Sequence, residues 1–104
     1  MTAMMTLADA RRKLDSLLVE IGKHIDGGVV VLEERTIAKP YGWIFFYNGK
    51  LFIETTDIMH AIAGNGPIVI LAETGETILL GTARRPAEEI ARFEHERSLM
   101  PRQQ

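Results

Sequence analysis

The stretch WIFFYNGKLFIE at residues 43–54 places two apolar runs on either side of the dipeptide Asn48-Gly49. Asn-Gly is the preferred central pair of a two-residue type I′ turn, because both residues tolerate positive φ angles. Residues 43–47 and 50–54 are therefore expected to form a β-hairpin. The turn also sets the register, so that Tyr47 faces Lys50 at the tip.

This register sorts the side chains of the hairpin onto two faces. One face is wholly apolar and is expected to lie in the core: Ile44, Phe46, Leu51 and Ile53. The other face combines rings with charges at its ends: Trp43, Phe45, Tyr47 and Phe52, with Lys50 and Glu54. Aromatic residues are enriched at binding hot spots. The second face is therefore either covered by a helix or open as a binding patch, and the sequence leaves both possibilities.

The segments outward from the hairpin complete the predicted fold. The helices are expected at residues 7–21, at 58–63 and from Pro86 onward. The strands are expected at residues 29–37, 43–47, 50–54, 68–72 and 77–80, with Pro40 ending the first of them. Together they predict an α+β fold: an antiparallel sheet of four to five strands, N- and C-terminal helices, and a short helix between the two hairpins. Residues 1–104 are expected to form one domain with loose ends at 1–5 and 101–104.

Composition narrows the possible partners. The 104 residues include 12 Lys and Arg against 14 Asp and Glu, a formal net charge of -2, so no basic excess is available to bind a nucleic-acid backbone. No cysteine is present, which excludes disulfides and a thiolate nucleophile. The longest apolar run, residues 68–72, is far shorter than the about 20 residues of a membrane helix. We expect a cytoplasmic protein without a nucleic-acid or membrane partner.

The sequence motifs predict no catalytic residue, no metal ion and no cofactor. The three histidines have no partner histidine at i+3 or i+4: His24, His60 and His95. The two serines, Ser16 and Ser98, do not lie in a Gly-x-Ser-x-Gly turn. The Gly-Asn-Gly-Pro run at residues 64–67 lacks the lysine of a phosphate-binding loop. Paired acids such as Glu54 and Asp57 are expected to stay solvated.

Several segments together resemble the immunity protein 35 family: KPYGWIFFYN at residues 39–48, AIAGNGPI at 61–68, Thr74-Gly75, and LGTA at 80–83. The resemblance extends from about Glu33 to Glu94. It implies a non-enzymatic, cytoplasmic antidote that holds a cognate bacterial toxin inactive. The matched residues are expected to specify the scaffold: Tyr41, Gly42, Trp43, Phe45, Phe46, Gly64, Gly66, Pro67 and Gly81.

Partner recognition is expected at polar and aromatic positions near the hairpin: Tyr47, Glu54, Asp57, His60 and Asn65. In this hypothesis these side chains occlude the active site of the toxin with one-to-one stoichiometry. Two alternatives remain. A chaperone-like or general protein-binding module would use exposed apolar area. A small enzyme or ligand-binding domain would need a deep pocket containing His60 and a carboxylate with a strongly shifted pKa.

Overall fold

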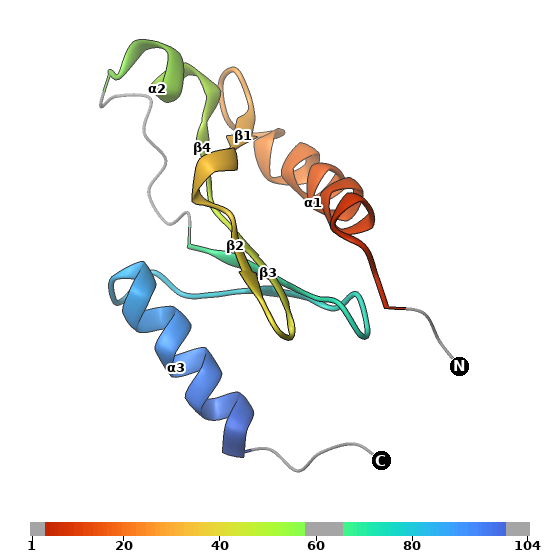
Figure 1. The fold of residues 1–104 in the computed structure, drawn as a ribbon. Helices are drawn as coiled ribbons and strands as arrows, with labels where there is room; N and C mark the ends of the chain where they lie inside the picture. The colour runs from red at the N-terminus through yellow and green to blue at the C-terminus, as the bar shows by residue number, and fades with distance from the viewer. Residues whose placement is uncertain (1–3, 58–65, 100–104) are drawn as a thin grey trace.

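The computed structural model describes residues 4–57 and 66–99, and within them it confirms the predicted α+β fold (Figure 1). The helices are α1 (Leu7–Gly22), α2 (Lys50–Thr55) and α3 (Pro86–Leu99). The strands are β1 (Val29–Val31), β2 (Ile37–Lys39), β3 (Gly42–Phe45), β4 (Tyr47–Gly49), β5 (Ile68–Leu71) and β6 (Thr77–Leu79). A 3₁₀ turn, η1, covers Glu33–Arg35.

The strands of the described residues form two antiparallel sheets. β2, β3, β5 and β6 make a four-stranded sheet in that order, and β1 pairs with β4 in a two-stranded sheet. β3 and β5 lie at the centre of the larger sheet, with Phe45 opposite Ile68 and Gly42 opposite Leu71. The chain passes from β3 through Phe46 directly into β4, so one continuous segment serves both sheets.

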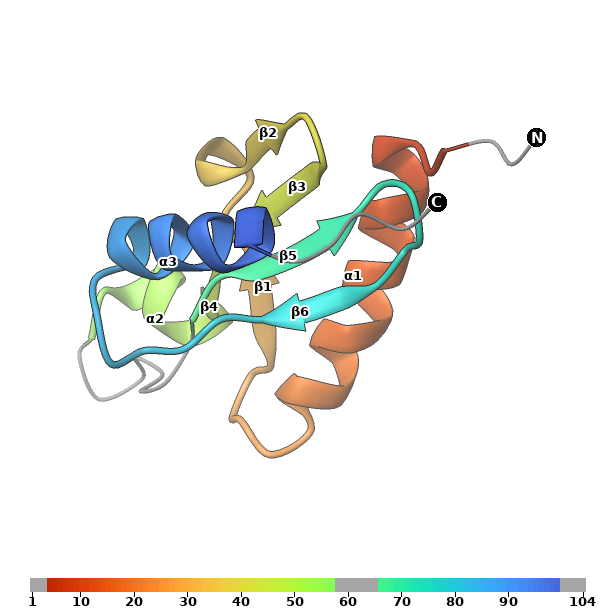
Figure 2. The ribbon, with the colours of Figure 1, turned by 90° about the horizontal axis from the view of Figure 1, so that it is seen from below.

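Two apolar cores lie on opposite faces of β3 and β5, because successive side chains of a strand point to opposite faces. The core under α1 contains Ala10, Leu14, Leu18, Phe45, Tyr47, Ile68 and Ile70. The core under α3 contains Ile44, Phe46, Val69, Leu71 and Ile90. Figures 1 and 2 show α1 and α3 on opposite sides of these strands. The ring-bearing face is therefore covered, since Phe45 is fully buried and Trp43 packs beside it.

Helix α1 begins at a capping box, which satisfies backbone groups at its first turn. The hydroxyl of Thr6 accepts a hydrogen bond from the N–H of Asp9, and the Asp9 carboxylate accepts one from the N–H of Thr6. These bonds, and then the charge of Arg12, lower the pKa of Asp9. The inner face of the helix is buried at one-turn intervals by Ala10, Leu14 and Leu18. The predicted first helix is confirmed.

The predicted hairpin at residues 43–54 is wrong in its second half. Asn48 and Gly49 do not form a turn, because they belong to β4 and pair with Val30 and Val29. Residues 50–55 form helix α2 instead of a strand. Of the face expected in the core, Ile44 and Phe46 are buried, Leu51 is half-buried, and Ile53 is 43% exposed.

The physical reason is that β1 supplies the partner for β4 that residues 50–54 were expected to supply. Gly27 and Gly28, with φ angles of 79° and 76°, lead the chain from the end of α1 into β1. A Cβ at Gly27 would lie 2.7 Å from Cγ of Leu51, so α2 packs against backbone that carries no side chain. Helix α2 then ends at Thr56, whose φ of 56° is left-handed.

The predicted strand at residues 29–37 is interrupted. β1 ends at Val31, η1 follows, and β2 begins at Ile37. Because β1 belongs to the two-stranded sheet and β2 to the four-stranded sheet, the chain must change course between them. The Arg35 guanidinium lies 4.7 Å from the ring centroid of Phe46, which anchors this turn to the core under α3. The expectation that the strand stops at Pro40 is confirmed.

The other predicted elements agree with the structure where it describes them. β5 and β6 form the second hairpin, and α3 begins at Pro86 with Ile90 buried. The helix expected at 58–63 lies outside the described residues, as do residues 1–3 and 101–104. Met5, which was expected in a loose end, donates its N–H to the carbonyl oxygen of Ala72 at 2.8 Å.

Replacing Phe45 tests whether this face of the sheet is buried under α1. Phe45→Ala is expected to lower the free energy of unfolding by about 3–5 kcal/mol, because it opens a cavity in a closely packed core. Ile53→Ala, on the exposed side of α2, is the control and is expected to change it by at most about 1 kcal/mol. Urea unfolding followed by circular dichroism measures both. Equal losses in the two variants would contradict the assignment of Phe45 to the core.

Candidate functional site

The structure separates the residues expected to bind a partner. Tyr47 is 6% exposed and lies in the core under α1, where burial raises the pKa of its phenol. The expectation that Tyr47 offers aromatic surface to a partner is therefore wrong. Its place in β4 explains the difference, because pairing with Val31 turns its side chain toward α1.

Two of the expected acidic residues are at the surface. Glu54 lies in the last turn of α2 and Asp57 follows the helix, and both are exposed. Ile53 beside them is one of the exposed large hydrophobic residues of the protein. This end of α2 therefore offers carboxylates next to apolar surface. The remaining residues named from the sequence lie outside the described part of the chain: His60, Gly64 and Asn65.

Tyr41 and Gly42 of the sequence motif form a tight corner between β2 and β3. Gly42 has a φ of 153°, and a Cβ there would lie 2.1 Å from the carbonyl oxygen of Ile70. A side chain at this position would force β3 away from β5. The carbonyl oxygen of Tyr41 accepts a 2.9 Å hydrogen bond from the N–H of Ala72, which extends the contact between the two strands.

The side chain of Tyr41 fastens helix α3 to this corner. Its hydroxyl donates a 2.7 Å hydrogen bond to Oε2 of Glu94, and Nζ of Lys39 lies 2.9 Å from the same oxygen. The bonds from Tyr41, then from Lys39, lower the pKa of Glu94, while burial raises the pKa of Tyr41. The ring packs edge-on against Phe93 with centroids 5.7 Å apart, and the Arg97 guanidinium lies 5.2 Å from its centroid.

The other described motif residues also join elements of the scaffold. Three are aromatic and lie in β3 or directly after it: Trp43, Phe45 and Phe46. Gly66 lies against the backbone of Leu80, and the carbonyl oxygen of Pro67 accepts a 2.9 Å hydrogen bond from the Leu80 N–H. Gly81 lies beside the buried carboxylate of Glu89. The motif thus marks packing contacts rather than a reactive centre.

A groove of about 450 Å³ runs between α1 and β1, and the sequence did not indicate it. Its lining residues are Arg11, Asp15, Leu18, Val19, Gly22, Lys23, Gly28, Val29, Val30 and Val31. Val19 is 64% exposed although it is apolar, whereas its neighbour Leu18 is 7% exposed. An apolar residue outside the buried stripe of an amphipathic helix was the one available signal.

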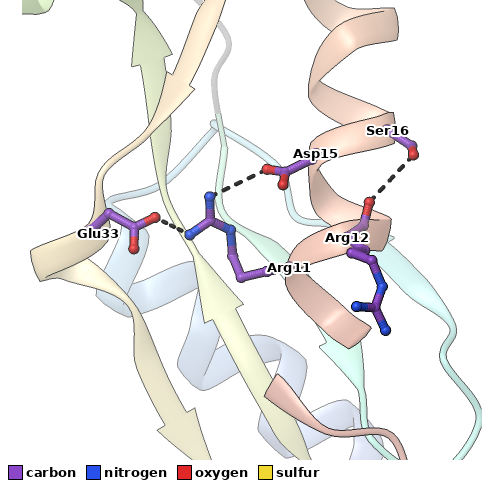
Figure 3. A network of polar contacts seen from close by, with 5 residues as sticks. All are labelled: Arg11, Arg12, Asp15, Ser16 and Glu33. Atoms are coloured by element: carbon purple, nitrogen blue, oxygen red, sulfur yellow. Dashed lines mark hydrogen bonds and ion pairs between the residues drawn. The ribbon is translucent and has the colours of Figure 1, made fainter. Parts of the chain in front are cut away.

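Arg11 links α1, which forms one wall of this groove, to η1, which follows the other wall, β1, along the chain (Figure 3). Nη2 lies 3.3 Å from a carboxylate oxygen of Asp15 one turn along α1, and Nη1 pairs with the carboxylate of Glu33 in η1. Nε of Arg11 is buried and has no hydrogen-bond partner in the described part of the chain. Nη1 and Nη2 are therefore each held by an acid, while the buried Nε has no acceptor in this part of the chain.

Residues 4–57 and 66–99 contain no group of three or more His, Cys, Asp or Glu side chains that could hold a metal ion. Over the same residues, no helix has the length and apolar character needed to cross a membrane.

Comparisons with known proteins agree with the resemblance drawn from the sequence. The chain matches the model of the immunity protein 35 family over residues 8–94. It is 35% identical over 86 residues to the uncharacterized protein YrhB of Escherichia coli strain K12, and the alignment covers 83% of this chain and 84% of that protein. No solved structure matches it. The chain belongs to the immunity protein 35 family.

The hydrogen bond from Tyr41 to Glu94 makes stability depend on pH. The folded pKa of Glu94 is lowered, so its contribution is present above the unfolded pKa of 4.5 and is lost as pH falls through the folded pKa. Tyr41→Phe is expected to lower the free energy of unfolding by about 1 kcal/mol at pH 7, since the acceptor is charged but partly exposed. The difference should shrink at pH 3 in urea titrations. In a Glu94→Gln background it should not vary with pH, and a constant difference in the unmodified background would contradict the assignment.

Proposed function

We propose that this protein is an immunity protein that binds a cognate bacterial toxin one to one and occludes its active site in the cytoplasm of the producing cell. The observation that carries the proposal is membership of the immunity protein 35 family over residues 8–94. The family name implies a toxin partner, and a bound antidote needs surface complementarity rather than a reactive group.

Exposed carboxylates support this proposal. Glu54 and Asp57 lie at the end of α2 beside the exposed side chain of Ile53, a combination of charge and apolar area suited to a protein partner. Charges at the rim of an interface act mainly on the association rate and on specificity. We infer that these two acids steer a toxin whose facing surface is basic.

The alternative of a general protein-binding module rests on exposed apolar side chains. They are Met4, Leu7, Val19, Ile37, Ile53 and Leu79. They belong to the N-terminus, α1, β2, α2 and β6, so they are spread over several elements. A spread of this kind favours a partner that recognises a defined surface over capture of many unfolded clients.

Coexpression with the toxin encoded beside its gene tests the proposed function. The full chain is expected to protect cells from that toxin and to copurify with it as a one-to-one complex, measured by growth and by sedimentation. Continued killing at excess of this protein, with no copurification, would contradict the proposal. Suppression of aggregation of unrelated client proteins would instead support the alternative module.

Neutralising the two acids of α2 tests their steering role. The double variant Glu54→Gln/Asp57→Asn is expected to slow association with the toxin by about three- to tenfold at low salt, with a smaller effect at high salt, because exposed charges are screened. Glu73→Gln/Glu76→Gln, on the exposed turn between β5 and β6, is the matched control and should leave the rate unchanged. Surface plasmon resonance measures both rates. Equal rates for the two double variants would remove Glu54 and Asp57 from the interface.

A further inference from the structure

Strand β1 has one edge that its own sheet does not use. The N–H of Lys50 donates to the carbonyl oxygen of Gly28 at 3.0 Å, and the N–H of Leu32 donates to the carbonyl oxygen of Phe46 at 2.7 Å. In an antiparallel ladder these bonds alternate along the strand, so residues 28, 30 and 32 face β4. The N–H and C=O groups of Val29 and Val31 therefore point away from β4. Within the described part of the chain no hydrogen bond takes them up.

The groove described above opens along this unused edge. Its walls are the outer side of α1 and the whole of β1, and its volume of about 450 Å³ is within the range of pockets that bind ligands. Val19 extends into it from α1 as an exposed apolar side chain. The backbone of an added strand lies about 4.7–4.9 Å from the backbone it pairs with. The side chains of an added peptide gain apolar contacts where they reach residues such as Val19.

The two outer edges of the larger sheet are less suited to strand addition. In β2 the charged Lys39 is followed by Pro40, and charge and proline both disfavour pairing at an edge. In β6 the outward groups belong to Thr77 and Leu79, because Leu80 bonds inward to Pro67. The groove between α1 and β1 does not reach β6, which makes β6 a natural control.

The charges around the groove indicate what kind of segment fits. Two cations line it, and each already has an acidic partner: Arg11 pairs with Asp15 and Glu33, and Lys23 pairs with Glu20 at 3.0 Å. The three carboxylates outnumber the two cations and are mostly exposed. Of these acids only Asp15 lines the groove, whereas Glu20 and Glu33 lie outside its lining as ion-pair partners; the five side chains together carry one net negative charge, which complements a basic segment.

Arg11 supplies a second indication that points to a backbone. Its Nε is buried and has no acceptor in the described residues, although Arg11 lines the groove. Leaving a buried donor unsatisfied is costly. Because this nitrogen is shielded from solvent in the isolated protein, the Arg11 side chain has to shift before a carbonyl oxygen of a strand laid along β1 can accept a hydrogen bond from it.

We propose that an extended segment of the toxin, apolar at its centre and carrying a basic residue, adds to β1 as a new strand in the groove beneath α1. This inference rests on the proposed function and adds a second contact surface to the acidic end of α2. Backbone hydrogen bonds to Val29 and Val31 provide affinity, Val19 and Leu18 receive an apolar side chain, and the carboxylates of Asp15, Glu20 and Glu33 receive the basic residue.

Two proline variants test the added strand. Val31→Pro removes one outward N–H and leaves the bonds between β1 and β4 intact, and it is expected to weaken binding of the neighbouring toxin at least about tenfold. Leu79→Pro removes an outward N–H from β6 and should change the dissociation constant less than about twofold. Isothermal titration calorimetry on variants whose circular dichroism matches the wild type measures both. Equal affinities would overturn the proposal.

A second pair of variants leaves the sequence of strand β1 unchanged. Val19→Arg places a bulky cation in the groove from an exposed helical position, so the fold should tolerate it, while binding should weaken at least about tenfold. Leu7→Arg, also exposed on α1 but outside the groove, should bind within about twofold of the wild type. Wild-type affinity in Val19→Arg would overturn the proposal even if Val31→Pro failed to fold.

Amide exchange followed by NMR reports on the strand directly. In the isolated protein the N–H groups of Val29 and Val31 should exchange faster than that of Val30, and addition of the toxin should slow both. Unchanged exchange in a formed complex would overturn the added strand while leaving the proposed function intact. Protection in the isolated protein together with a dimer in sedimentation would overturn it in favour of a second copy of this chain. A toxin that the wild type does not bind would refute the proposed function, and the docking inference with it.

Discussion

The antiparallel pairing of β3 with β5 is the constraint on which the other parts of the structure depend. Both strands are covered on both faces, so their side chains alternate between the core under α1 and the core under α3. If the register of one of these strands moved by one residue, each of its side chains would change face, and its apolar residues would no longer pack as they do against α1 and α3. The absence of a side chain at Gly42 permits the close approach of β3 to β5, and Tyr41 beside it ties α3 to the same corner.

The sequence predicted best the elements whose signal is local. The spacing of Ala10, Leu14 and Leu18 and the proline at residue 86 placed the two long helices, because a helix satisfies its own backbone. The segment at 48–55 failed for the opposite reason. Asn48-Gly49 suits a turn, yet the pairing of β4 was decided by β1, some 18 residues away as counted from Val30 to Asn48. Local turn preference is weak against such a tertiary contact.

The candidate site was predicted only in part, for a related reason. Exposure of Glu54 and Asp57 follows from their charge, so the sequence could identify them as surface residues. Tyr47 was misplaced because its face depended on the partner of β4. The sequence offered one signal for the groove, the apolar Val19 outside the buried stripe of α1; the groove itself exists because α1 lies alongside β1, and neither segment carries a motif. The bonds of Arg11 to Asp15 and Glu33 join residues from different elements, and only the fold brings them together.

Leu18 and Val19 are adjacent in α1 and both line the groove, but one is buried in the core and the other is mostly in water. A change at Leu18 disturbs packing, whereas a change at Val19 alters the groove at little cost to the fold. The other lining residues divide in the same way. Gly22 is a packing position, because the backbone of Gly28 lies close to it, whereas Asp15 and Lys23 are exposed. Substitutions at exposed lining residues such as Val19, Asp15 and Lys23 can therefore change the shape and charge of this groove while the scaffold is kept.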